Sequence, residues 1–130
     1  MPQTIEQTTA ELVARYVAAW NETDPESRRD AVSALWAPDG VEFVEGTAFT
    51  GHDELFARLS GAHEEFVANR RFSVSAAEDA SRHDDVIAFT IQLSTPSGNV
   101  AWAARVFLML DDDDHIREDY QLTVKPLVEE

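Results

Sequence analysis

The chain has 130 residues, and its 25 acidic against 10 basic side chains give a formal net charge of −15. One domain is expected at this length, with a core that buries roughly two thirds of the unfolded surface. No basic block offers phosphates a binding surface, so neither nucleic acid nor anionic membrane is an expected partner. The absence of cysteine excludes disulfides and thiolate chemistry. The N-terminal MPQTIEQTTAEL has no leader-like or membrane-spanning pattern, so a soluble, cytoplasmic protein is expected.

The first part of the chain predicts two helices. Thr8 and Glu11 fit a capping box, and the apolar residues that follow share one helical face. Asp24 offers an N-cap before Pro25, and a second apolar stripe runs until a turn at residues 38–40 (Pro-Asp-Gly). The stripes consist of Leu12, Val13, Tyr16, Val17 and Trp20 in the first helix, and of Ala31, Val32, Leu35 and Trp36 in the second.

A strand and a third helix follow. Val41 to Glu45 alternates apolar and acidic residues, which is typical of a half-buried strand, and residues 46–51 form a loop or a short strand. Gly51 opens a helix in which His63 follows Leu59 by four positions and so points inward. The apolar face of this helix holds Leu55, Phe56, Leu59, Phe66 and Val67.

The second half of the chain predicts four strands. Residues 72–76 alternate with period two, and residues 80–85 form a polar turn. Val86 to Leu93 and Val100 to Leu110 are apolar on nearly both faces, which is typical of central strands, and residues 95–99 form the hairpin turn between them. Ile116 to Val124 follows an acidic turn and carries Asp119 and Gln121 on one parity. This last pair of strands is the expected pocket floor.

The order of helix, helix, strand, helix and four-stranded meander indicates an α+β fold. A strongly curved antiparallel or mixed sheet would wrap around the three helices as a cone, with a pocket between its concave face and the first helix. Three helices can cover only one face of such a sheet. We therefore expect a homodimer through the convex face.

Four stretches of sequence carry a family resemblance. They are ARYVAAWNETD at residues 14–24, ALWAPDG at 34–40, the GHDEL helix start at 51 and the closing DDDDHIRED. Together they resemble the SnoaL-like polyketide cyclase family of the nuclear transport factor 2-like superfamily. The resemblance covers nearly the whole chain and implies one SnoaL-like domain over residues 1–130, with a cystatin-like α+β roll and frequent dimers. It specifies the fold better than the reaction, because this scaffold holds many chemistries and many binding-only proteins.

The resemblance also implies roles for particular residues. Tyr16 matches the tyrosine that donates a hydrogen bond to an oxyanion in the steroid isomerases, and Asp119 matches the aspartate base of the cyclases. The base aspartate of the isomerases would fall near Val44, and their second acid near Val106, so both departures oppose isomerisation. The acids nearest to the first of these positions are Glu42 and Glu45.

Asp119 is the candidate general base. A carboxylate among large apolar rings loses solvation, its pKa rises, and it can take a proton from carbon or from water. The alternative is an ion pair with Arg105, because pairing Leu110 with Ile116 would place Asp119 diagonal to that arginine. Arg105 could instead polarise a carbonyl, bind a carboxylate, or cross to the other face toward a partner subunit.

Two further side chains have both a chemical and a structural interpretation. Tyr16 could stabilise an oxyanion or be a buried ring with a satisfied hydroxyl. His63 could act as an acid or base or fill a polar corner of the core. The side chains expected to line the pocket around these groups are Trp20, Trp36, Glu42, Val44, Phe56, Leu59, Trp102 and Gln121.

No cofactor or metal is expected. The acidic run 111–114 with His115 lacks the glycine and glutamate positions of a calcium loop, and no zinc, serine-nucleophile or phosphate-loop motif occurs. The leading hypothesis is a cofactor-independent enzyme of cyclase, isomerase or hydratase/hydrolase type that acts on an apolar, polyketide-like small molecule. The alternative is a ligand-binding or interaction module. A cavity of at least ~300 Å³ lined by Asp119 and Tyr16 would favour the enzyme.

Overall fold

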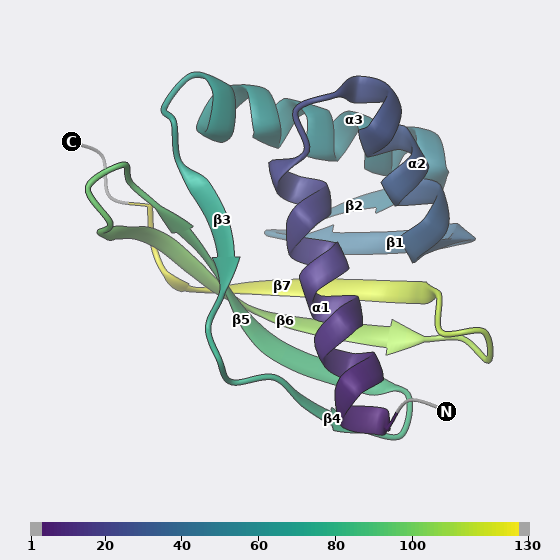
Figure 1. Ribbon diagram of the computed structural model, residues 1–130. Coiled ribbons are helices and arrows are strands. Elements are labelled where there is room, and N and C mark those ends of the chain that lie inside the picture. Colours follow the sequence, from purple (N-terminus) through teal and green to yellow (C-terminus); the bar gives the residue numbers. More distant parts are fainter. Residues whose placement is uncertain (1–3, 128–130) are drawn as a thin grey trace.

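The computed structural model describes residues 4–127. Residues 1–3, which belong to the N-terminal segment considered above, and residues 128–130 lie outside this range. Helices and strands alternate as predicted in the first half of the chain, and the second half is almost entirely strand (Figure 1). The helical elements are α1 (Ile5–Asn21), α2 (Pro25–Leu35), α3 (Gly51–Ala62) and the π-helical continuation of α3, η1 (His63–Ala68). The strands are β1 (Trp36–Val44), β2 (Thr47–Thr50), β3 (Ser73–Ala76), β4 (Ser81–His83), β5 (Val86–Ser94), β6 (Val100–Leu110) and β7 (Ile116–Lys125).

The seven strands form one mixed sheet in the order β2-β1-β7-β6-β5-β3, with β4 paired to β5. Strands β3, β5, β6 and β7 form the predicted meander, and β6 is central. Strand β1 pairs with β7 in parallel, which joins the first half of the chain to the end of the meander. Figure 1 shows the sheet curving, with α1 lying across one face and with α2 and α3 near β1 and β2. The α+β cone is therefore confirmed.

The two faces of the sheet differ in burial. Along β5, Ile87, Phe89, Ile91 and Leu93 are buried against the helices, while the residues between them are only partly buried. The same alternation runs along most of β6. Strand faces alternate with a period of two, so the inner side forms the core and the outer side is left half-exposed within the described chain. The two central strands are thus covered on one face only.

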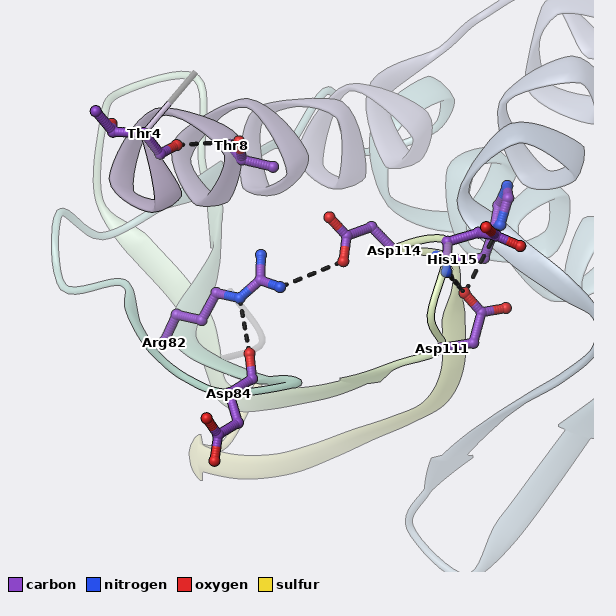
Figure 2. Close-up of polar contacts among 8 residues, drawn as sticks. Thr4, Thr8, Arg82, Asp84, Asp111, Asp114 and His115 are labelled. Carbon is purple, nitrogen blue, oxygen red and sulfur yellow. Dashed lines mark hydrogen bonds and ion pairs between the residues drawn. The ribbon is translucent and has the colours of Figure 1, made fainter. Parts of the chain in front are cut away.

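Helix α1 begins one turn earlier than the sequence predicted. Its N-cap is Thr4, whose side chain accepts from the Gln7 backbone at 3.1 Å while its backbone N–H donates to the Gln7 side chain at 2.9 Å. The expected cap, Thr8, lies inside the helix and donates its hydroxyl to the Thr4 carbonyl (Figure 2). Both positions offer a threonine followed three residues later by Glu or Gln, so local chemistry did not distinguish them. The predicted cap of α2, Asp24, is confirmed.

Two other predicted turns contain strand. Trp36 begins β1 instead of extending α2, and residues 38–40 lie within that strand at a shift in its pairing with β7. Gly40 permits this close approach, because a Cβ there would lie 2.8 Å from the Ile116 carbonyl oxygen. The polar segment 80–85 holds the short strand β4. No helix among the described residues is long and apolar enough to cross a membrane.

Candidate active site

Three polar side chains lie fully buried where β1, β7 and α1 meet. Asp119 on β7 is the direct register partner of Glu42 on the parallel strand β1, so their side chains point to the same inner face. Tyr16 of α1 packs over them, and all three residues have no exposed surface. Glu42 was expected at the pocket, and its side chain does point inward. The neighbouring Phe43 points to the outer face, where it stacks on Tyr120 at 4.9 Å between ring centres.

A chain of hydrogen bonds connects Asp119 to Gln121. The Tyr16 hydroxyl donates to Asp119 Oδ2 at 2.6 Å, and Gln121 Nε2 donates to Tyr16 Oη at 2.9 Å. Trp36 and Phe89 each lie 5.6 Å from the Tyr16 ring between centres, which fixes the ring in an apolar cage. The oxygen–oxygen distance lies within the usual range for an O–H···O hydrogen bond.

Arg58 of α3 is the cation of this cluster. Its Nε donates to Glu42 Oε1 at 2.9 Å, and its side chain is 22% exposed while that of Glu42 is fully buried. The guanidinium lies 5.1 Å from the Trp20 ring centre and 5.5 Å from that of Phe49. Aromatic faces attract a cation, so the two rings hold Arg58 between them. Sequence reasoning missed this residue, although a buried acid needs a cation near it.

Burial shifts the acid–base properties of the cluster. It raises the pKa of Asp119 well above its ordinary value, and the nearby Glu42 carboxylate raises it further. Burial also raises the pKa of Glu42, against the attraction of Arg58, which lowers it. The pKa of Tyr16 is raised well above its ordinary value by burial and then by the charge of Asp119. Both carboxyl groups therefore resist ionisation.

A pocket of 520 Å³ opens beside this cluster. Arg58 and Gln121 supply polar groups to its wall, while among residues 4–127 the wall includes neither Asp119 nor Tyr16. The volume is above the ~300 Å³ that would favour an enzyme. The expected lining by Asp119 and Tyr16 is not found, because Arg58 and Gln121 lie between the pocket and the buried acids. Its aromatic lining consists of Trp20, Phe49, Phe66 and Trp102.

The structure places the side chains predicted to line the pocket in three different surroundings. Trp20, Val44, Trp102 and Gln121 line it, and Glu42 is its buried neighbour through Arg58. Trp36 and Leu59 are instead fully buried in the core. Phe56 lies under Arg29, with the guanidinium 4.2 Å from the ring centre. Helical periodicity indicated burial correctly for Trp20 and Leu59 but did not distinguish core from pocket.

Arg105 lies on the opposite face of the sheet from Asp119. Leu110 pairs with Ile116 as predicted, but Met109 then pairs with Glu118, which leaves Arg117 as an extra residue in β7. This bulge shifts the register by one, so Asp119 faces Leu108 instead of lying diagonal to Arg105. The guanidinium of Arg105 binds Asp79 Oδ2 at 2.8 Å. The alternative interpretation of Asp119, an ion pair with Arg105, is therefore wrong.

His63 points inward as predicted, at the junction of α3 and η1. Its pKa is lowered, first by burial and then by the charge of Arg28. Its Nε2 has no hydrogen-bond partner within residues 4–127, and it is not part of the described pocket wall. Within residues 4–127, His63 takes no part in the hydrogen bonds that join Tyr16, Asp119 and Gln121.

The acidic turn between β6 and β7 is organised by one carboxylate. Asp111 Oδ1 accepts from the backbone N–H groups of Asp113 and His115, both at 2.9 Å. These bonds, that of His115 first, lower the pKa of Asp111. Figure 2 shows Asp111 beside His115, with Asp114 bound to Arg82 at 3.2 Å. Asp111, Asp113 and His115 lie close enough together to hold a metal ion, but Asp111 Oδ1 already accepts the two backbone hydrogen bonds that close the turn.

Comparison with known proteins identifies the fold. No protein-family model matches the sequence, and neither does any curated protein. A solved structure of a proposed isomerase of the SnoaL-like family from Agrobacterium tumefaciens is 21% identical over 90% of this chain and 97% of its own, with a TM-score of 0.82. A proposed polyketide cyclase from Sinorhizobium meliloti is 16% identical over 91% and 99%, with a TM-score of 0.68.

A third structure has a bound ligand. It is a protein with a ketosteroid isomerase-like fold from Catenulispora acidiphila in complex with trimethylamine, 20% identical over 87% of this chain and 85% of its own, with a TM-score of 0.65. These likenesses show that the chain has the SnoaL-like, nuclear transport factor 2-like fold that its motifs resembled. Proteins with this fold include proposed isomerases, cyclases and hydroxylases, and proteins of unknown function.

Proposed function

We propose that this protein binds an apolar small molecule carrying a carbonyl group and moves a proton within it without a cofactor. The observation that carries the proposal is the buried Tyr16–Asp119 pair, which Gln121 connects to a pocket of 520 Å³. That volume lies in the range of pockets that take small organic ligands. Aromatic and aliphatic walls suit a largely apolar body, and the reactive oxygen would lie at the polar end.

Arg58 and Gln121 are the groups that would contact the reacting oxygen. Within residues 4–127, Arg58 uses only its Nε in a hydrogen bond, which leaves its two terminal nitrogens as donors at the pocket wall. Gln121 adds an amide donor. Donors fixed in a water-poor site stabilise negative charge that develops on a carbonyl oxygen. Ligand binding that displaces Gln121 from Tyr16 would add the tyrosine hydroxyl to the donors that contact this oxygen.

Asp119 is the proposed proton-exchanging group. Its raised pKa brings it nearer to the range in which a carboxyl can both accept and return a proton. The names of the similar structures, a proposed isomerase and a proposed polyketide cyclase, fit proton transfer next to a carbonyl. The trimethylamine complex of the third supports a small organic ligand in this fold.

One observation favours a second function, a binding module without catalysis. Asp119 and Tyr16 have no exposed surface, and a ligand in the described pocket would first touch Arg58 and Gln121. In that case the buried cluster of Tyr16, Glu42 and Asp119 would only form the floor of the pocket. The two functions therefore differ in whether a bound ligand exchanges protons with the protein.

Hydrogen–deuterium exchange separates them. Apolar ketones that quench the tryptophan fluorescence are incubated with the protein in D₂O, and NMR follows the C–H bonds next to the carbonyl. Faster exchange with the wild type than with Asp119→Asn, at equal ligand affinity, supports the enzyme. Binding with no faster exchange than in buffer for every ligand would establish the binding module.

We also propose that two copies associate through the outer face of the sheet. That face carries the stacked Phe43 and Tyr120, together with Leu122 and Val124, which are 58% and 63% exposed. A single self-complementary patch would bury roughly 1,200–2,000 Å² in such a dimer. The charge of −15 on each chain opposes association, so added salt should tighten the contact.

A further inference from the structure

Two buried carboxyl oxygens in the candidate active site have no hydrogen-bond partner. They are Asp119 Oδ1 and Glu42 Oε2, for which no partner exists within residues 4–127. They belong to residues that are directly opposite each other on parallel strands and point to the same face. Buried polar atoms are nearly always paired, so two unpaired oxygens on neighbouring residues call for a common explanation.

The donors that contact the two carboxyl groups bind their other oxygens, and the terminal nitrogens of Arg58 make no hydrogen bond to either group within residues 4–127. Tyr16 has one hydroxyl proton, which it gives to Asp119 Oδ2, and Gln121 donates to Tyr16. Arg58 Nε donates to the other oxygen of Glu42. An ionised carboxylate can only accept. If both groups were ionised, two acceptors would remain unpaired, and two negative charges would share one cation in an apolar site, which is costly.

We infer that Glu42 and Asp119 form one acid pair that holds a single proton between Oε2 and Oδ1. The proton turns one orphan into a donor and the other into its acceptor, which satisfies both atoms at once. It also leaves one negative charge, which matches the single cation Arg58. Glu42 retains that charge because it contacts the guanidinium, so the proton belongs to Asp119.

Each element packed against the Glu42–Asp119 pair contributes one neighbouring side chain. Helix α1 supplies Tyr16, helix α3 supplies Arg58, and β6 supplies the apolar Leu108 opposite Asp119. Burial and the mutual repulsion of the two carboxylates raise the pKa of Asp119 in the same sense. The inference concerns the resting protein and does not depend on the proposed function. In this state Asp119 is a proton donor, and it becomes a base only after the pair has lost its proton.

NMR of protein labelled with ¹³C at the aspartate and glutamate carboxyl carbons tests the pair directly. At pH 7 we expect one buried carboxyl to be protonated and its signal to vanish in Asp119→Asn. In Glu42→Gln the Asp119 titration should move to lower pH, because the adjacent negative charge is gone and Arg58 attracts the carboxylate. Glu45→Gln, at an exposed position just beyond the same strand, should leave it unchanged.

The wild-type spectrum tests the shared proton even if Glu42→Gln fails to fold. No protonated carboxyl at pH 7, or two of them, would overturn the single shared proton. An Asp119 titration unmoved by a folded Glu42→Gln variant would overturn the pairing of the two residues.

Discussion

Glu42 and Asp119 lie directly opposite each other on the parallel strands β1 and β7, fully buried, with Arg58 bound to Glu42 at 2.9 Å. Two acids and one cation in an apolar site require strong coupling between charge, protonation and stability.

Asp119→Asn should abolish proton exchange on a bound ligand and leave the free energy of unfolding within ~1 kcal/mol of the wild type. An asparagine has the shape and neutrality of the protonated acid, can accept from Tyr16 and can donate to Glu42. Chemical denaturation measures the stability, and exchange in D₂O measures the activity. A loss of ~3–5 kcal/mol would instead indicate that Asp119 is ionised and paired in the native protein.

The stability of the wild type relative to Asp119→Asn should fall as pH rises. The pKa of Asp119 is raised on folding, so the native state holds its proton where the unfolded chain has lost it. Its contribution is complete below the unfolded pKa and disappears as pH rises through the folded pKa. Urea unfolding across this window gives the difference. A difference that grows with pH would mean that folding lowers this pKa.

Arg58→Met should destabilise the protein by about 3 kcal/mol, because it leaves Glu42 buried without its cation. Adding Glu42→Gln to this variant should recover part of the loss, which urea unfolding would measure. Arg29→Met is the matched control, since its pair with Asp53 is exposed and should contribute ~0–1 kcal/mol. Equal losses for the two single variants would argue against a buried ion pair.

Trp20→Ala should cost about 3 kcal/mol of stability, near the lower end for a buried ring, because one side of Trp20 already faces the pocket. It should also weaken ligand binding and loosen Arg58, whose guanidinium packs on the ring. Thermal unfolding and fluorescence titration measure the two effects. A loss below ~1 kcal/mol would show that the ring contributes little to the core.

The protein should scatter light as a dimer at micromolar concentration and moderate salt, with twice the chain mass of 14.5 kDa. Leu122→Asp should shift the mass toward that of one chain, because it places a charge in the apolar outer patch. Ala57→Asp, on the exposed side of α3, is the control. A wild-type mass near that of one chain would refute the dimer.

Local patterns in the sequence were sufficient for much of the fold. The capping residue Asp24, the apolar stripe of α1 and the hairpin turn at residues 95–99 were each predicted from neighbouring residues alone. Helix periodicity also placed Tyr16 and His63 inward. Such features depend on interactions within a few residues, which is why composition and spacing reveal them.

The candidate active site depended on contacts between distant parts of the chain. The parallel pairing of β1 with β7 brings Glu42 beside Asp119, and α3 adds Arg58. The single extra residue at Arg117 shifts the register of β7 against β6, so Asp119 and Arg105 lie on opposite faces of the sheet. Strand periodicity shows which residues share a face, but not which strand becomes the neighbour or where a bulge shifts the register. The sequence by itself thus determined most of the elements and the inward position of Tyr16, whereas tertiary pairing decided which charges meet.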